Sequence, residues 1–311
     1  MKRKVNRVGQ NTLTVSLPSK WVEENKIEKG NELNINTEGN NITLSKSEIK
    51  KKCKEISFNI DNYNYFALNR HLTILYRMDF DRIILTYSNN LILHPKKQKE
   101  MSLNKSIIKL IERYIGAEIV SQSTKKTEIE CFVTSEILNL QKIEQRIYFL
   151  MKQAMNEMIN SIGKDYKEFH DTMYNIHDNI SKFINYYLRT LYASDKEKEE
   201  KKLSYALYQV IDKVVDKLRH IDEAIFTYGC TPKAKKLLKE IFNYFCEQML
   251  LIKQKEVGSD FIQKRYSIVD KVKKTNFTIK ELRVIMEADL LLNTINDFSE
   301  HVYLRKSLRE L

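Results

Sequence analysis

Glycine and proline are scarce in this sequence of 311 residues, which contains seven glycines and three prolines. Together these residues usually make up about 12% of a chain. Because both interrupt regular backbone structure, their scarcity favours long helices over collagen-like or disordered classes. The glycines form no G-x-G-x-x-G and no G-x-x-x-x-G-K-[ST] string. The two nucleotide-binding loops that depend on those strings are therefore excluded.

Long apolar runs and paired cysteines are also missing. The runs Met249–Ile252 and Leu290–Leu292 are far shorter than the roughly 18 residues of a membrane-spanning helix. The cysteines are far apart and form no C-x-x-C motif: Cys53, Cys131, Cys230 and Cys246. The N-terminus is basic and polar and has no apolar signal segment. We therefore expect a cytoplasmic protein with reduced thiols and no membrane insertion.

Sequence motifs of catalysis are absent as well. No serine lies in a G-x-S-x-G string, and no H-E-x-x-H string occurs. The cysteines have no histidine paired with them in an evident motif. These absences predict a regulator or binding protein and not an enzyme.

Positive charge is concentrated at the start of the chain. The formal net charge is +12, and residues 2–10 hold Lys2, Arg3, Lys4 and Arg7 without any acid. Residues 22–38, by contrast, hold five glutamates and two lysines. A basic segment of this kind favours an anionic partner such as duplex DNA.

The first 48 residues predict a small β domain. Apolar residues alternate at Leu13, Val15 and Leu17 and again around residues 33–35 and 42–44, which is typical of half-buried strands. A short helix is expected from Pro18 to about Gly30, and a hairpin turn at residues 38–41. The predicted order is β, β, short α, β, β.

Residues 3–21 (RKVNRVGQNTLTVSLPSKW) and 27–33 (IEKGNEL) resemble the swapped-hairpin DNA-binding domain of the AbrB/SpoVT/MazE type. The resemblance implies an intertwined homodimer whose N-terminal strands present basic residues to DNA. The residues in those positions are Lys2, Arg3, Lys4 and Arg7. In the alternative reading, the hairpin only dimerises and its lysines form a solvated strand edge.

Residues 54–134 predict a small α/β linker domain of βαβαβ order. Strands are expected at 56–60, 83–85 and 128–133, and helices at 65–76 and 106–115. We see no reactive cluster in this segment.

Residues 136–311 predict a helix bundle, because apolar residues recur at helical spacing and glycine or proline marks the corners. The string that begins at Ile211 returns at Leu292, an offset of 81 residues. We therefore predict a duplicated three-helix bundle, residues 136–228 and 229–311, in a mainly α protein. The expected helices are Gln141–Ile162, Tyr166–Tyr192, Lys196–Thr227, Pro232–Lys255, Phe261–Lys273 and Ile279–Leu308.

Acidic residues and histidines recur on the third and sixth helices of this bundle. Asp212, Asp216 and His220 are four residues apart and share one helix face. Asn293, Asp297 and His301 repeat the pattern. Such a face suits a weakly bound divalent or ferric cation, although the same spacing also describes a solvated surface.

The strings VIDKVVDKLRHI (210–221) and LNTIND (292–297) resemble the repeated E-x-x-x-D mark of PhoU, the regulator of phosphate uptake. Asp212 replaces the usual Glu, Asn293 replaces an acid, and the fifth helix keeps the acid Asp270. With the N-terminal hairpin, the whole chain resembles archaeal PhoU-type regulators. The resemblance implies a regulator of phosphate uptake and metal clusters on the bundle. The alternative is an adaptor that docks on a phosphate transporter ATPase or a sensor protein.

Overall fold

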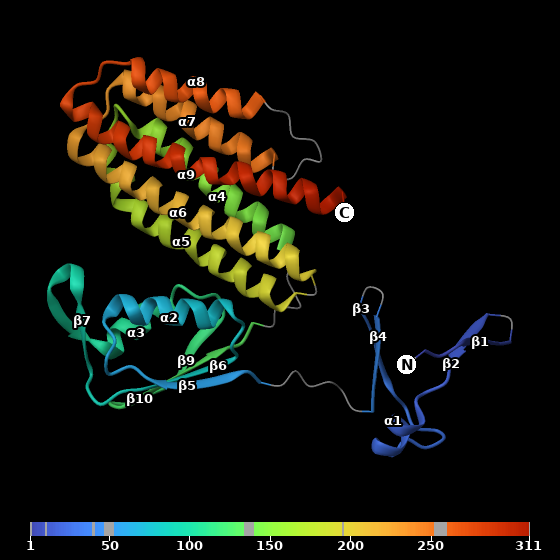
Figure 1. The fold of residues 1–311 in the computed structure, drawn as a ribbon. Helices are drawn as coiled ribbons and strands as arrows, with labels where there is room; N and C mark the ends of the chain where they lie inside the picture. The colour runs from blue at the N-terminus through green and yellow to red at the C-terminus, as the bar shows by residue number, and fades with distance from the viewer. Residues whose placement is uncertain are drawn as a thin grey trace. The chain divides into compact units, whose positions relative to one another are not determined.

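The structure is a computed structural model, and it describes residues 2–9, 11–38, 41–46, 53–133, 140–194, 196–251 and 260–310. The chain divides into two compact units, Met1–Lys52 and Cys53–Leu311 (Figure 1). Each unit is described by itself below. The finer division of the second unit into three domains stays a prediction.

The first unit contains two short β-hairpins and a short helix. Strand β1 (Val5–Val8) pairs antiparallel with β2 (Thr12–Val15), and β3 (Asn34–Glu38) pairs antiparallel with β4 (Asn41–Ser45). Between them lies helix α1 (Ser19–Glu24). The predicted order of elements agrees with this arrangement.

Both hairpins carry an apolar face that the described residues of the first unit do not cover. Val5 is opposite Val15 in the first hairpin, and Ile35 is opposite Leu44 in the second. Leu13 shares the face of Val5 and is 68% exposed. No described side chain in residues 2–46 is buried. The first unit therefore has no core of its own in a single chain.

The second unit begins with a sheet of four strands in the order β5-β6-β10-β9. Strand β5 (Glu55–Asn59) is parallel to β6 (Arg82–Thr86), and helix α2 (Tyr65–Arg77) connects them. Strand β10 (Lys126–Cys131) is antiparallel to β6 and to β9 (Ala117–Gln122). An α/β layer was predicted here.

The predicted βαβαβ order of this layer is wrong in two respects. It lacks β9, and it lacks a hairpin made of β7 (Leu91–His94) and β8 (Lys99–Ser102), which are joined by the 3-10 turn η1 (Pro95–Lys97). Helix α3 (Leu103–Ile111) also begins and ends earlier than predicted. Its start is fixed by Ser102, whose Oγ accepts a hydrogen bond from the Lys105 backbone nitrogen.

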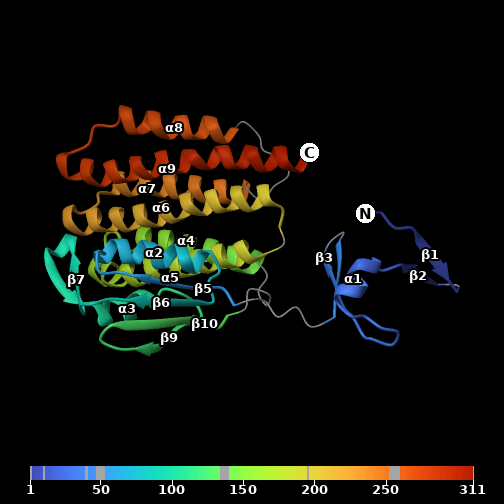
Figure 2. The ribbon, with the colours of Figure 1, turned by 60° about the horizontal axis from the view of Figure 1, so that its bottom comes forward.

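The rest of the second unit is helical, as predicted, and the described helices match the expected ranges to within a few residues. Helices α4 to α6 pack on one another, α9 packs on α7 and α8, and α6 packs along α9 to join the two sets (Figure 2). The helices are α4 (Leu140–Ser161), α5 (Tyr166–Ala193), α6 (Lys198–Tyr228), α7 (Pro232–Leu251), α8 (Asp260–Lys274) and α9 (Ile279–Glu310).

Positions 81 residues apart on α6 and α9 are buried alike. Ile211 and Leu292 are both fully buried, and so are Val214 and Ile295. The repeated string therefore turns the same apolar side of each helix into the core.

The α/β layer is fastened to the helices through Arg189 of α5. Figure 1 shows α2 between the sheet and α5, and these two helices are in contact. Arg189 is 1% exposed. Its Nη1 donates to the carbonyl oxygens of Tyr76 at 3.0 Å and Phe80 at 2.9 Å, and its Nη2 lies 2.9 Å from Asp79 Oδ1. A buried cation thus holds the end of α2 against the bundle.

Candidate functional site

The four predicted DNA-binding residues lie together at the start of the first hairpin. Lys2, Arg3 and Lys4 precede β1, and Arg7 is in β1 opposite Leu13. All four side chains are exposed, and none has an ion-pair or hydrogen-bond partner among the described residues. Their charges are therefore available to an anionic partner.

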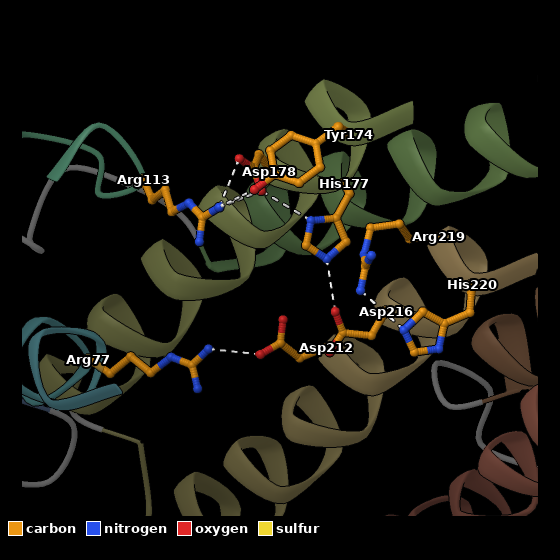
Figure 3. Close-up of polar contacts among 9 residues, drawn as sticks. All are labelled: Arg77, Arg113, Tyr174, His177, Asp178, Asp212, Asp216, Arg219 and His220. Atoms are coloured by element: carbon orange, nitrogen blue, oxygen red, sulfur yellow. Dashed lines mark hydrogen bonds and ion pairs between the residues drawn. The ribbon is translucent and has the colours of Figure 1, made fainter. Parts of the chain in front are cut away.

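A second polar cluster joins α5 to α6 in the second unit (Figure 3). His177 is at its centre: Nε2 is 3.0 Å from Asp216 Oδ1, and Nδ1 is 3.1 Å from Asp178 Oδ1. Asp178 also accepts from Arg113, with Nη2 3.1 Å from Oδ2. Because each ring nitrogen of His177 faces a carboxylate oxygen, the geometry favours the doubly protonated imidazolium.

The pKa values in this cluster follow from burial and from the paired charges. Burial alone lowers the pKa of His177, but the hydrogen bonds with Asp178 and Asp216 outweigh it and raise that pKa above its ordinary value. Burial opposes ionisation of Asp216, yet the hydrogen bond with His177 leaves its pKa below the ordinary value. Both shifts stabilise the charged pair.

Asp212 belongs to a neighbouring ion pair that is more deeply buried. Arg77 Nη2 is 3.0 Å from Asp212 Oδ2, while Arg77 Nε donates to Asn185 Oδ1 at 2.8 Å. Burial raises the pKa of Asp212, and the charge of Arg77 only partly offsets this. This pair links α2 to α6 across the α/β layer and the bundle.

The predicted cation-binding residues are thus placed among cations. Asp212 faces Arg77 and Asp216 faces His177, whereas His220 lies beside Arg219, with Nε2 3.1 Å from Nη2. Burial and the charge of Arg219 lower the pKa of His220.

The remaining residues of that prediction are scattered. Asp270 is on α8, 3.3 Å from Lys274, and His301 is on α9, while the side chain of Asp297 lies outside the described residues. No group of three or more His, Cys, Asp or Glu side chains in the described part of the chain could hold a metal ion. The metal site stays a prediction that this arrangement does not support.

The second unit also contains a basic cavity that the sequence did not predict. Its volume is about 820 Å³, and it lies where η1, α2 and α3 meet α5 and α6. Six cationic side chains line it: Lys96, Lys97, Lys105, Lys109, Arg113 and Arg219. Three of them are four residues apart along the chain and could have signalled a basic helix face. The cavity itself depends on packing between segments that are far apart in sequence.

Residues 7–52 match the family model described as antidote-toxin recognition MazE, bacterial antitoxin. The match confirms a MazE/AbrB-type N-terminal domain and includes Arg7, but it begins after Lys2, Arg3 and Lys4. Neither the curated proteins nor the solved structures gave a match to this chain. The PhoU-like identity of the helices stays a prediction.

None of the described helices has both the length and the apolar character that a membrane span requires.

Proposed function

We propose that this chain is a homodimeric DNA-binding regulator that contacts duplex DNA through its first unit. The observation that carries the proposal is a MazE-type segment that combines uncovered apolar hairpin faces with unpaired cations at its N-terminus. A domain of this type fits a DNA-binding regulator in general terms.

Dimerisation follows from the lack of a core in the first unit. Val5, Leu13 and Val15 line one face of a hairpin and are all exposed in the single chain. A two-stranded hairpin is marginally stable by itself in water, and it needs further strands or a covering surface. A second copy of the same segment supplies both.

DNA binding follows from the cations that the dimer would bring together. A dimer holds two copies of each of these residues, one from each chain: Lys2, Arg3, Lys4 and Arg7. If about six of these charges neutralise phosphates, log K falls with log salt at a slope of about −5. A two-stranded ribbon can also enter the major groove and reach base edges.

The decisive measurement is fluorescence anisotropy of a labelled duplex of about 30 base pairs, titrated with the full chain at several salt concentrations. The Arg3→Ala/Arg7→Ala variant should bind more weakly and with a flatter salt slope. Lys20 and Lys29 are exposed in the same unit, so Lys20→Ala/Lys29→Ala is the matched control. An affinity independent of salt, or no binding at low salt, contradicts the DNA-binding role.

A failure to bind DNA would favour a protein partner for the first unit. The description of the matched family names recognition of a toxin by its antidote. A dimer that binds no duplex would therefore act through protein contacts, which agrees with the adaptor alternative drawn from the sequence.

Within the DNA-binding proposal, we take regulation of phosphate uptake as the narrower role. Its support is the resemblance of residues 210–221 and 292–297 to the PhoU mark. Duplexes from upstream of phosphate-transporter genes of the same genome should then compete better than random duplexes. Equal competition would leave the general role and remove the narrower one. Binding to a purified phosphate transporter ATPase without DNA binding would favour the adaptor.

A further inference from the structure

The basic cavity of the second unit has an excess of unpaired positive charge. Lys96 and Lys97 are on η1, and Lys105 and Lys109 are one turn apart on α3. None of the four ammonium groups has an ion-pair or hydrogen-bond partner among the described residues. Asp216 is the one carboxylate among the described residues of the lining, and it is already paired with His177. Like charges around one cavity repel each other, so an anionic ligand would stabilise them.

Aromatic side chains lie on two sides of the same cavity. Tyr65 stacks on His94 with ring centroids 4.8 Å apart, and Phe66 meets His94 edge to face at 5.2 Å. Phe66 is 39% exposed, and Tyr174, on the α5 side, is 49% exposed. Partly uncovered rings in a cavity can stack on a flat aromatic ligand group.

The size of the cavity distinguishes between possible anions. About 820 Å³ is within the range of about 300–1,000 Å³ that is typical of small-molecule sites. Inorganic phosphate would occupy a small part of this space and would leave the aromatic rings unused. An anion that reaches both the lysines and the rings must carry phosphates and a flat ring system.

We propose that this cavity binds a nucleotide with at least two phosphates. Lys96, Lys97, Lys105 and Lys109 hold the phosphates, and the base stacks against Phe66 or Tyr174. Binding here uses side-chain ammonium groups and not a glycine-rich loop, in agreement with the absence of such loops from the sequence.

A ligand in this cavity would contact both the α/β layer and the helices α5 and α6 of the unit. Lys105 and Lys109 belong to the α/β layer. Tyr174 and Arg219, shown in Figure 3, belong to α5 and α6. A nucleotide that contacts both sides therefore stabilises their packing. This proposal goes beyond DNA binding and does not depend on it.

The test is isothermal titration calorimetry of the full chain with ADP, GDP, CDP and UDP, with pyrophosphate as the probe for phosphate contacts alone. At least one nucleotide should bind at least about 10-fold more tightly than pyrophosphate, because base stacking adds to the phosphate contacts. Lys105→Ala/Lys109→Ala should weaken both kinds of ligand by about 10-fold or more. At least one of Phe66→Ala and Tyr174→Ala should weaken the nucleotide several-fold and leave pyrophosphate unchanged.

Two controls separate the site from general effects of charge and folding. Lys152 and Lys213 are exposed helix lysines outside the cavity lining, so Lys152→Ala/Lys213→Ala should change the affinity less than about twofold. Lys105→Gln/Lys109→Gln removes the charges and keeps a polar side chain at each position, and circular dichroism checks that each variant is folded.

Three outcomes overturn the proposal. No nucleotide binds at about 1 mM, or pyrophosphate binds as tightly as every nucleotide, or Lys105→Ala/Lys109→Ala and Lys152→Ala/Lys213→Ala change the nucleotide affinity equally. None of these outcomes changes the DNA-binding measurement, which is made on Arg3 and Arg7.

Discussion

The two units of this chain differ in how they bury apolar side chains. In the first, Leu13 and Ile42 are 68% and 69% exposed, and no described side chain is buried. In the second, Leu72 of α2, Ile147 of α4 and Leu291 of α9 are fully buried. Since burial of apolar surface is the main driving force of folding, the second unit is stable within one chain. We expect the first to require association.

Removal of the first unit tests this difference most strongly. A fragment of residues 53–311 should stay folded and be monomeric, whereas the full chain should be dimeric, because the uncovered hairpin faces lie in residues 2–46. Light scattering and thermal unfolding of both proteins give the answer. A fragment that is still fully dimeric would place the principal interface in the second unit.

Substitution of Arg189 tests whether the second unit depends on its buried ion. Arg189→Met removes the cation beside the buried Asp79 and the side-chain donor to the carbonyl oxygens of Tyr76 and Phe80. Loss of one partner of a buried ion pair costs about 3–5 kcal/mol.

Denaturant unfolding of the 53–311 unit measures this loss. The matched control is Arg146→Met, since Arg146 is exposed on α4, and it should cost less than about 0.5 kcal/mol. Equal losses in the two variants would show that Arg189 does not hold the layers together.

Two exposed isoleucines, one in each unit, test whether an exposed apolar side chain contributes to dimer stability. Ile42 is 69% exposed in the first unit and Ile279 is 82% exposed in the second. Ile42→Thr should weaken the proposed dimer by about 1–2 kcal/mol per chain, because a second chain would cover this face. Ile279→Thr should stay within about 0.5 kcal/mol. Similar small effects of both substitutions on the dimer dissociation constant would contradict a covered hairpin face.

Acid stability of the second unit gives a smaller effect. Glu281, in the first turn of α9, accepts hydrogen bonds from Thr231 Oγ1 at 2.5 Å, from the Thr278 backbone nitrogen at 2.7 Å and from Thr278 Oγ1 at 2.8 Å. These bonds lower its pKa from 4.5 to about 2. A lowered carboxyl pKa contributes stability that is complete above the unfolded pKa and is lost as pH falls from 4.5 toward 2.

Glu281→Gln should therefore lower the melting temperature by a few degrees at neutral pH, and the difference should shrink as the pH approaches 2. Thermal melts of both proteins across that pH range, read by circular dichroism, measure the effect. A difference of the same size at all pH values would show that the charge of Glu281 does not contribute.

The long helices were predictable because many turns repeat the same apolar spacing. Over the 31 residues of α6, errors at single positions average out, and Gly229 marks the end. The short strand β9 has one buried residue, Ala117, so it gives little alternation to detect. In the hairpin of β7 and β8, burial alternates over only the four residues of β7 and does not alternate along β8, and the predicted order omitted this hairpin.

The polar contacts of the second unit were not predictable, because they join residues distant in sequence. Arg77 and Asp212 are 135 residues apart, and Arg113 and Asp178 are 65 apart. From spacing alone, the acids of α6 suggested a ligand set for a cation. Tertiary packing instead places protein cations against Asp212 and Asp216, which helical periodicity cannot reveal.

The buried Arg189 also decides where the chain can be cut. A cut in the segment between β10 and α4 would separate this arginine, on α5, from Asp79 and from the carbonyl groups at the end of α2. Each half would then expose polar groups and apolar surface that the other half now covers. We therefore expect a protease to release separately folded units only by a cut near residue 52. The two fragments from a cut between β10 and α4 should recover their fold only when they are mixed.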